Sequence, residues 1–168
     1  GLPPDAPGAQ PRVLPAAVNK VVDLWFYDDA SDTTVQTFAF VYEGSAAVIG
    51  LGVNTPTSVS HYSYRIGSEQ FSTGIPRTTG WHQFTFDYRS GRDVKLYIDG
   101  KPVAVSTAAA SFDRILLGDM WASGFHGFNY FDDVRILDYV PFNTPLFWDS
   151  FENGLGHWTV FNGTPGTD

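Results

Sequence analysis

The clearest pattern in the chain is an alternation of apolar and polar residues between positions 80 and 106. Two runs place an apolar side chain at every second position. The apolar residues of these runs are Phe84, Phe86, Tyr88, Val94, Leu96 and Ile98. A period of two is typical of strands with one buried and one exposed face. Asp99 and Gly100 then favour a tight hairpin, because both tolerate a positive φ. The region predicts consecutive antiparallel strands.

The rest of the chain shows the same period in shorter runs. We predict further strands at 18–27, 35–42, 46–53, 61–66, 115–117 and 130–137. The segments 72–80 and 118–129 are rich in glycine and polar residues and are interpreted as loops. No window has a helical apolar stripe. The sequence therefore predicts an all-β protein, a two-sheet antiparallel jelly-roll sandwich.

Composition narrows the possible partners. The 168 residues are enough for one domain with a full core. The net charge of −8 argues against nucleic acid and anionic lipid as partners. No apolar run approaches the roughly 20 residues that would insert into a membrane. Cysteine is absent, which excludes disulfides and thiolate chemistry.

Four segments, taken in order, carry a family resemblance: "GWHQF", "LYIDGKPV", "RILLGD" and "YFDDVRI". This order resembles the laminin-G-like branch of the concanavalin A-like jelly rolls, over roughly residues 18–140. The resemblance implies two stacked antiparallel sheets. It also implies a family used mostly for glycan binding, adhesion and glycoside hydrolysis, so we expect a secreted protein, extracellular or at the cell surface.

The chain ends look displaced relative to this family. Residues 1–17 form a proline-rich extended arm, 18–140 the sandwich, and 141–168 a tail. The tail's "DSFENGLGHW" is similar to the opening strand of secreted sandwich modules. Either the tail folds back on its own sandwich, or it completes the sandwich of another copy. The residues predicted to make such a joint are Leu2, Val13, Leu14, Phe147, Trp148, Phe151 and Trp158.

Catalysis is not expected. Enzymes that the chain resembles carry Glu-x-Asp-x-x-Glu on one strand, and none of Glu43, Glu69 and Glu152 has that spacing. The adjacent acids of 28–29 and 132–133 point to opposite faces of a strand and cannot grip one bond together. No Gly-x-Ser-x-Gly elbow is present.

A structural calcium ion is the cofactor that the sequence suggests. In modules of this type, the opening Phe-Glu and the closing Asp often share a calcium, which prefers hard oxygen ligands. The matching candidate ligands are Glu152, Asp133, Asp149 and Asp28. Alternatively, the acids at 132–133 cap strand ends and bond to the backbone, Arg114 or Arg135.

Exposed aromatic residues are the candidates for glycan binding or for a subunit interface, and the sequence does not separate these uses. The candidates are Trp121, Phe125, His126, Tyr130 and Arg65. Trp25 and Trp81 are expected in the core, and His82 half-buried in the sheet. The first hypothesis is a non-catalytic structural subunit that assembles with copies of itself, head to tail, into a fibre or surface array. The alternative is a carbohydrate-binding adhesion module that recognises a polysaccharide.

Overall fold

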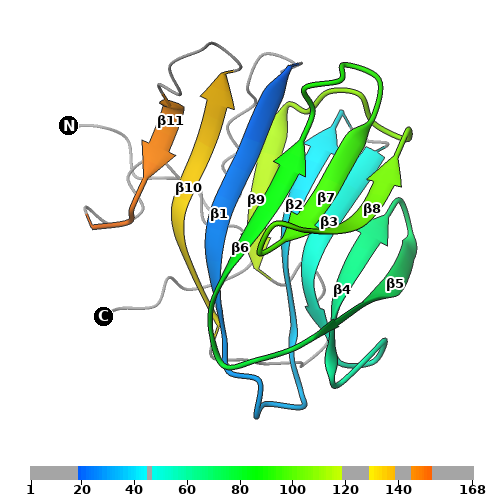
Figure 1. The fold of residues 1–168 in the computed structure, drawn as a ribbon, viewed down its shortest axis with the longest axis vertical. Helices are drawn as coiled ribbons and strands as arrows, with labels where there is room; N and C mark the ends of the chain where they lie inside the picture. Colours follow the sequence, from blue (N-terminus) through cyan, green and yellow to red (C-terminus); the bar gives the residue numbers. More distant parts are fainter. Residues whose placement is uncertain (1–18, 45–46, 119–128, 139–144, 153–168) are drawn as a thin grey trace, which may run out of the picture.

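The computed structural model describes residues 19–44, 47–118, 129–138 and 145–152. Within these residues, the chain forms two stacked antiparallel sheets (Figure 1), which is the predicted jelly-roll sandwich. The strands are β1 (Lys20–Asp28), β2 (Gln36–Glu43), β3 (Ala47–Asn54), β4 (His61–Ile66), β5 (Glu69–Pro76), β6 (Gly80–Asp87), β7 (Val94–Ile98), β8 (Lys101–Ser106), β9 (Arg114–Gly118), β10 (Tyr130–Asp138) and β11 (Pro145–Asp149). No helix in these ranges is long and apolar enough to cross a membrane.

The strand order defines one six-stranded and one five-stranded sheet. The first runs β11-β10-β1-β6-β7-β8, and the second runs β5-β4-β3-β2-β9. Alternate residues of each strand meet in one core between the sheets, as the period of two predicts. The fully buried members of this core include Val22, Leu24, Phe26, Ala39, Ile49, Leu51, Phe84, Phe86 and Leu96.

The predicted hairpin at Asp99 and Gly100 is confirmed. Both residues have positive φ, 49° and 72°, and Ile98 pairs with Lys101 across the two-residue turn. Asp99 also binds the neighbouring strand, because its Oδ1 accepts the backbone N–H of Gln83 at 2.8 Å. The turn therefore fixes the register of β7 and β8 against β6.

The prediction of a loop over 72–80 is wrong for most of its length. Residues up to Pro76 belong to β5, which pairs with β4 at the edge of the five-stranded sheet. An edge strand has a neighbour on one side only, so it tolerates the glycine, proline and polar residues that the sequence reading took for a loop.

The tail contributes the strand β11, Pro145–Asp149, which overlaps the predicted opening strand of 149–158 only at Asp149. Residues 150–152 are not part of a strand. Residues 153–158 lie outside the described ranges. The strand β11 pairs with β10 of the same chain, with Trp148 opposite Arg135. This segment therefore folds back on its own sandwich at the sheet edge seen in Figure 1.

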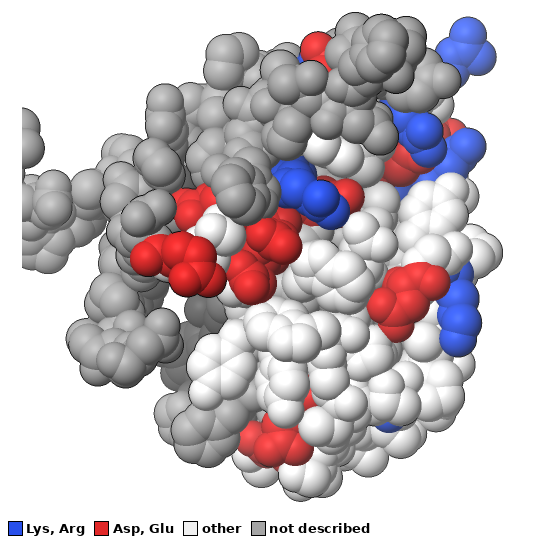
Figure 2. Space-filling model, turned by 60° about the vertical axis from the view of Figure 1, so that its left-hand side comes forward, with Lys and Arg blue, Asp and Glu red and all other residues white. Residues whose placement is uncertain are grey.

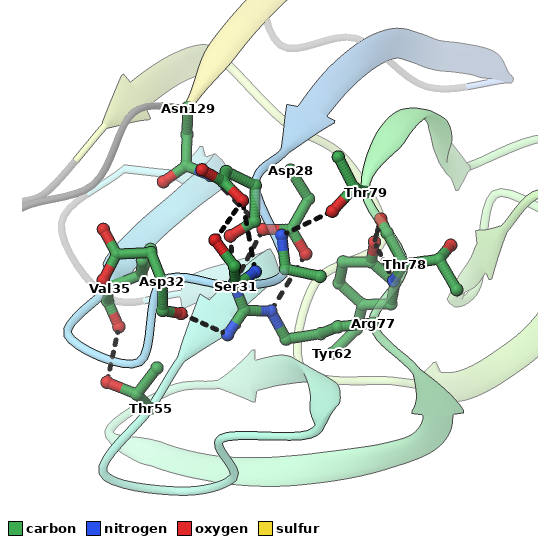
Figure 3. Close-up of polar contacts among 12 residues, drawn as sticks. Asp28, Ser31, Asp32, Val35, Thr55, Tyr62, Arg77, Thr78, Thr79 and Asn129 are labelled. Atoms are coloured by element: carbon green, nitrogen blue, oxygen red, sulfur yellow. Dashed lines mark hydrogen bonds and ion pairs between the residues drawn. The ribbon is translucent and has the colours of Figure 1, made fainter.

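One end of the sandwich is held together by Arg77. Its guanidinium and the carboxylate of Asp28 are almost completely buried and form a two-point ion pair of 2.8 and 2.9 Å (Figure 3). The remaining N–H groups donate to the backbone carbonyls of Asp29, Asp32 and Val59. The side chain thereby joins the loops after β1, β3 and β5.

Candidate functional site

An aromatic row crosses three strands on the outer face of the six-stranded sheet. Tyr27 of β1 lies in register with Trp81 of β6 on one side and with Tyr130 of β10 on the other. These residues alternate with core residues such as Phe26, so their side chains point away from the core. Trp81 is 47% exposed and Tyr130 is 53% exposed.

The rings of this aromatic row support one another. The ring centroid of Tyr27 lies 5.5 Å from that of Trp81, near perpendicular, and 6.0 Å from that of Tyr130. Neighbouring strands are about 4.8 Å apart, so three side chains in register cover about 10 Å of surface. The row is a preformed apolar platform with its outer two residues open to solvent.

Polar residues continue this face along the strands. In the next row, Trp25 lies between Asp132 and Gln83. In the row beyond, Arg135 donates to Asp23 at 2.8 Å, and Gln83 donates to the same carboxylate at 3.4 Å. Sugar-binding surfaces generally combine an apolar face with a few polar groups that fix orientation. Both kinds of group are present here.

A bulge in β10 makes this arrangement possible. Asp23 pairs with Arg135 and Trp25 with Asp132, so β10 carries one more residue than β1 between these pairs. Asp133 absorbs the irregularity with a φ of 47°. A bulge shifts the alternation by one residue. As a result, Asp132 and Arg135 both lie on the outer face while Val134 remains in the core.

The electrostatics of the platform are acidic. Burial raises the pKa of the Asp23 carboxyl above its ordinary value; the hydrogen bond and charge of Arg135 oppose this, and the negative charge of Asp133 adds to it. Figure 2 shows acidic side chains gathered beside an uncharged surface on the side where β10 and β11 lie. Asp132 has no basic partner within the described residues, and its Oδ1 accepts the N–H of Asp133 at 2.7 Å.

Most of the aromatic row was not predicted from the sequence. Trp25 and Trp81 were expected in the core, and this is wrong for Trp81, which is among the most exposed large apolar residues described. Trp25 is only partly buried and shares the outer face with Tyr27. The signal was the period of two itself, because Trp81 is out of phase with the core residues Phe84 and Phe86.

The predicted glycan-binding residues are described only in part. Tyr130 belongs to the aromatic row. Arg65 lies on the other sheet, 6.0 Å above the ring of Phe40, and its Nε donates to the carbonyl of Gly67. Trp121, Phe125 and His126 lie outside the described residues. His82 is buried more deeply than expected, with its ring nitrogens 2.7 Å from Asp99 and 2.8 Å from the carbonyl of Thr78.

Two of the predicted calcium ligands, Asp133 and Asp149, lie on the paired strands β10 and β11, where Val134 is opposite Asp149. Asp28 is engaged by Arg77 at the end of β1. Asp133 lies at the bulge, and Asp149 is buried and accepts the N–H of Phe151. Glu152 is exposed. Within the described ranges, no three His, Cys, Asp or Glu residues are grouped as a metal site. Calcium binding stays a prediction.

The predicted assembly residues are described only in part. Phe147 and Trp148 belong to β11, opposite Ile136 and Arg135 of the same chain. Phe151 is half-buried and packs against the core of its own chain. Leu2, Val13, Leu14 and Trp158 lie outside the described residues, so an assembly through them stays a prediction.

Comparison with known proteins identifies a family. A laminin-G-like family model, described as the concanavalin A-like lectin/glucanases superfamily, matches residues 14–142. No curated protein matches the chain.

Similar solved structures include a sialidase, a galectin and an arabinanase domain. The sialidase has a TM-score of 0.46 and 12% identity, with 70% of this chain and only 11% of that chain covered. The galectin LEC-6 of Caenorhabditis elegans has a TM-score of 0.42 and 10% identity, with 68% and 88% covered. Domain 4 of AbnA, an extracellular arabinanase from Geobacillus stearothermophilus, was solved with arabinotriose. It has a TM-score of 0.45 and 19% identity, with 80% and 67% covered.

Proposed function

Because the chain belongs to the concanavalin A-like lectin/glucanase superfamily, we propose that it is a non-catalytic carbohydrate-binding module of the extracellular space. Its binding surface is the aromatic row of Trp81, Tyr27 and Tyr130. The single observation that carries this proposal is the alignment of three aromatic side chains across β6, β1 and β10, with the outer two about half exposed.

The aromatic row matches a sugar chain in shape and in chemistry. Aromatic faces stack on the apolar faces of sugar rings, while nearby carboxylate and amide groups bond to hydroxyls. The row is about 10 Å long by strand spacing, which suits two consecutive sugar units. Because the rings contact one another, little side-chain freedom is lost when a ligand binds, and this favours affinity.

Absence of catalysis is part of the proposal, and the neighbourhood of the row supports it. Hydrolysis of a glycosidic bond needs two carboxyl groups that flank it. Asp23, beside the row, is committed to Arg135 through two bonds of 2.8 and 3.3 Å. Asp132 and Asp133 are adjacent in sequence and linked by a side chain to backbone bond.

Affinity electrophoresis in gels containing soluble polysaccharides tests the proposal. We expect at least one gel to retard the chain, and Trp81→Ala to weaken that binding by at least about tenfold, as loss of an aromatic anchor typically does. Phe71→Ala is the matched control, because Phe71 is a 37% exposed aromatic residue on β5 of the other sheet. Equal retardation of all three proteins would exclude the aromatic row as the binding surface.

Assembly into a fibre or surface array is the second function that we keep as a proposal. It would use β11, which lies at a sheet edge and bonds only to β10 among the described strands. In a single chain this strand pairs with β10 on one side, so assembly would either add a strand from another copy to the outer edge of β11 or exchange β11 between copies. Sedimentation of the full chain over a range of concentrations distinguishes a polymer from a monomeric module.

A further inference from the structure

The negative charge next to the aromatic row indicates which charge the ligand should have. Arg135 is the only basic residue that faces Trp25 and Asp132 from β1, β6 or β10 in the described part, and Asp23 neutralises it. Asp132 then adds a carboxylate without a basic partner among the described residues. The surface beside Trp25 therefore carries an excess of negative charge.

Aromatic faces and carboxylates both favour a positively charged ligand. The face of a tryptophan or tyrosine ring attracts a cation, and the attraction strengthens where water is excluded. A carboxylate beside the ring adds a charge-assisted hydrogen bond to an ammonium group. A neutral sugar would use only part of this surface, and a uronic or sulfated sugar would be repelled by it.

We propose that the preferred ligand is a cationic amino-sugar chain, such as partially deacetylated poly-N-acetylglucosamine. This inference rests on the proposed function, because the sugar rings stack on the aromatic row of Trp81, Tyr27 and Tyr130. The ammonium group of a neighbouring unit bonds to the Asp132 carboxylate and lies against Trp25. Asp132 is in register with Trp25 and two residues from Tyr130 on the same face, so one extended chain reaches both.

The test compares glucosamine oligomers with their N-acetylated counterparts by titration calorimetry, using the full chain. We expect the amino form to bind at least about tenfold more tightly at low salt, with the difference shrinking as salt screens the charge. Asp132→Asn should abolish most of the difference while leaving the weaker binding of the acetylated form. The asparagine oxygen still accepts the N–H of residue 133, so the bulge is preserved.

A matched control separates a specific contact from general attraction to an acidic protein. Glu69→Gln removes the same charge from an exposed position on β5 of the other sheet, so its amino-sugar affinity should equal that of the unmodified chain. Equal losses in the two variants, or equal affinity of the unmodified chain for both oligomers, would overturn the inference. If the acetylated oligomer still depends on Trp81, the proposed function survives; if Trp81→Ala affects neither oligomer, both proposals fail.

Discussion

Tyr88, which directly follows β6, carries a buried hydroxyl into the hydrophobic core. Its side chain is fully buried, and the hydroxyl has no hydrogen-bond partner within the described structure. We expect Tyr88→Phe to raise the free energy of unfolding by about 1–3 kcal/mol, the cost of an unsatisfied buried polar group. Tyr62→Phe should instead lower it by about 1 kcal/mol, because the Tyr62 hydroxyl donates to Thr78. Urea denaturation of the two variants checks the opposite signs.

The buried hydroxyl of Tyr88 should also make the stability of the fold sensitive to alkaline pH. Burial, with a smaller contribution from the charge of Glu43, raises the pKa of Tyr88 above its ordinary value of 10.0. Above pH 10 the unfolded chain loses this proton and the folded chain keeps it, so stability falls as pH rises. Tyr88→Phe should therefore flatten the decline above pH 10, leaving the part due to Tyr62, whose pKa is also raised by burial. An unchanged slope would contradict the assignment.

At the scale of single residues, the sequence correctly predicted which positions alternate, but it did not predict which aromatic residues are exposed. The alternation around Phe84 and Phe86 correctly gave the buried face of β6. Trp81 was nevertheless expected in the core, although the same alternation places it on the opposite face. Registers between strands are set by long-range pairing, so the alignment of Tyr27 with Tyr130 could not be derived from the local pattern.

The connection between β5 and β6 depends on Arg77. Replacing it by methionine would leave the Asp28 carboxylate buried without its partner, which typically costs about 3–5 kcal/mol. Arg89→Met is the matched control, because Arg89 is half-exposed and its ion pair with Asp87 should contribute at most about 1 kcal/mol. Thermal denaturation of both variants measures the contrast. Similar losses would show that the buried network does not hold this end of the sandwich.

The pairing of β2 with β3 depends on two glycines. Gly50 and Gly52 lie opposite Phe40 and Phe38. A Cβ at Gly52 would come within 2.1 Å of the carbonyl oxygen of Thr37, whereas a Cβ at Gly50 would meet chiefly the Phe40 ring. We expect Gly52→Ala to destabilise the fold by about 3 kcal/mol or more, and Gly50→Ala by less, because a side chain shifts more easily than a backbone. Chemical denaturation gives the order, and a reversed order would contradict this account.

At the scale of elements, the hairpin between β7 and β8 was predictable and the edge strand β5 was not. The dipeptide of Asp99 and Gly100 is a local signal, and it gave the turn correctly. The strand β5 has no such local signal in its composition. It forms because it pairs with β4, which is a contact that a local pattern does not reveal. Ser72 and Thr73 also bond to the backbone N–H groups of Gly74 and Ile75. These bonds occupy donors that an exposed edge would otherwise offer to another chain.

At the scale of the whole molecule, the two sides of the six-stranded sheet differ in how they are closed. At one edge, β8 carries Pro102 and a register irregularity in its pairing with β7, which oppose the addition of a further strand. At the other edge, β11 covers β10. The segment 145–149 of the tail thus pairs within its own chain, which is one of the two arrangements predicted for the tail. Two routes to an array built on strand pairing remain at this edge, the addition of a strand to the outer side of β11 and the exchange of β11 between copies.

A pair of introduced cysteines tests whether β11 pairs within its own chain or is exchanged between copies. The chain has no cysteine of its own that could form other disulfides. Arg135 and Trp148 lie directly opposite each other in β10 and β11, so cysteines at both positions suit a cross-strand disulfide. With β11 paired in its own chain, oxidation of Arg135→Cys/Trp148→Cys should give a monomer on a non-reducing gel, with a bond that resists dilution. Trp148→Cys alone controls for random oxidation. A ladder of disulfide-linked multimers from the double variant, absent from the single one, would show that β11 is exchanged between copies.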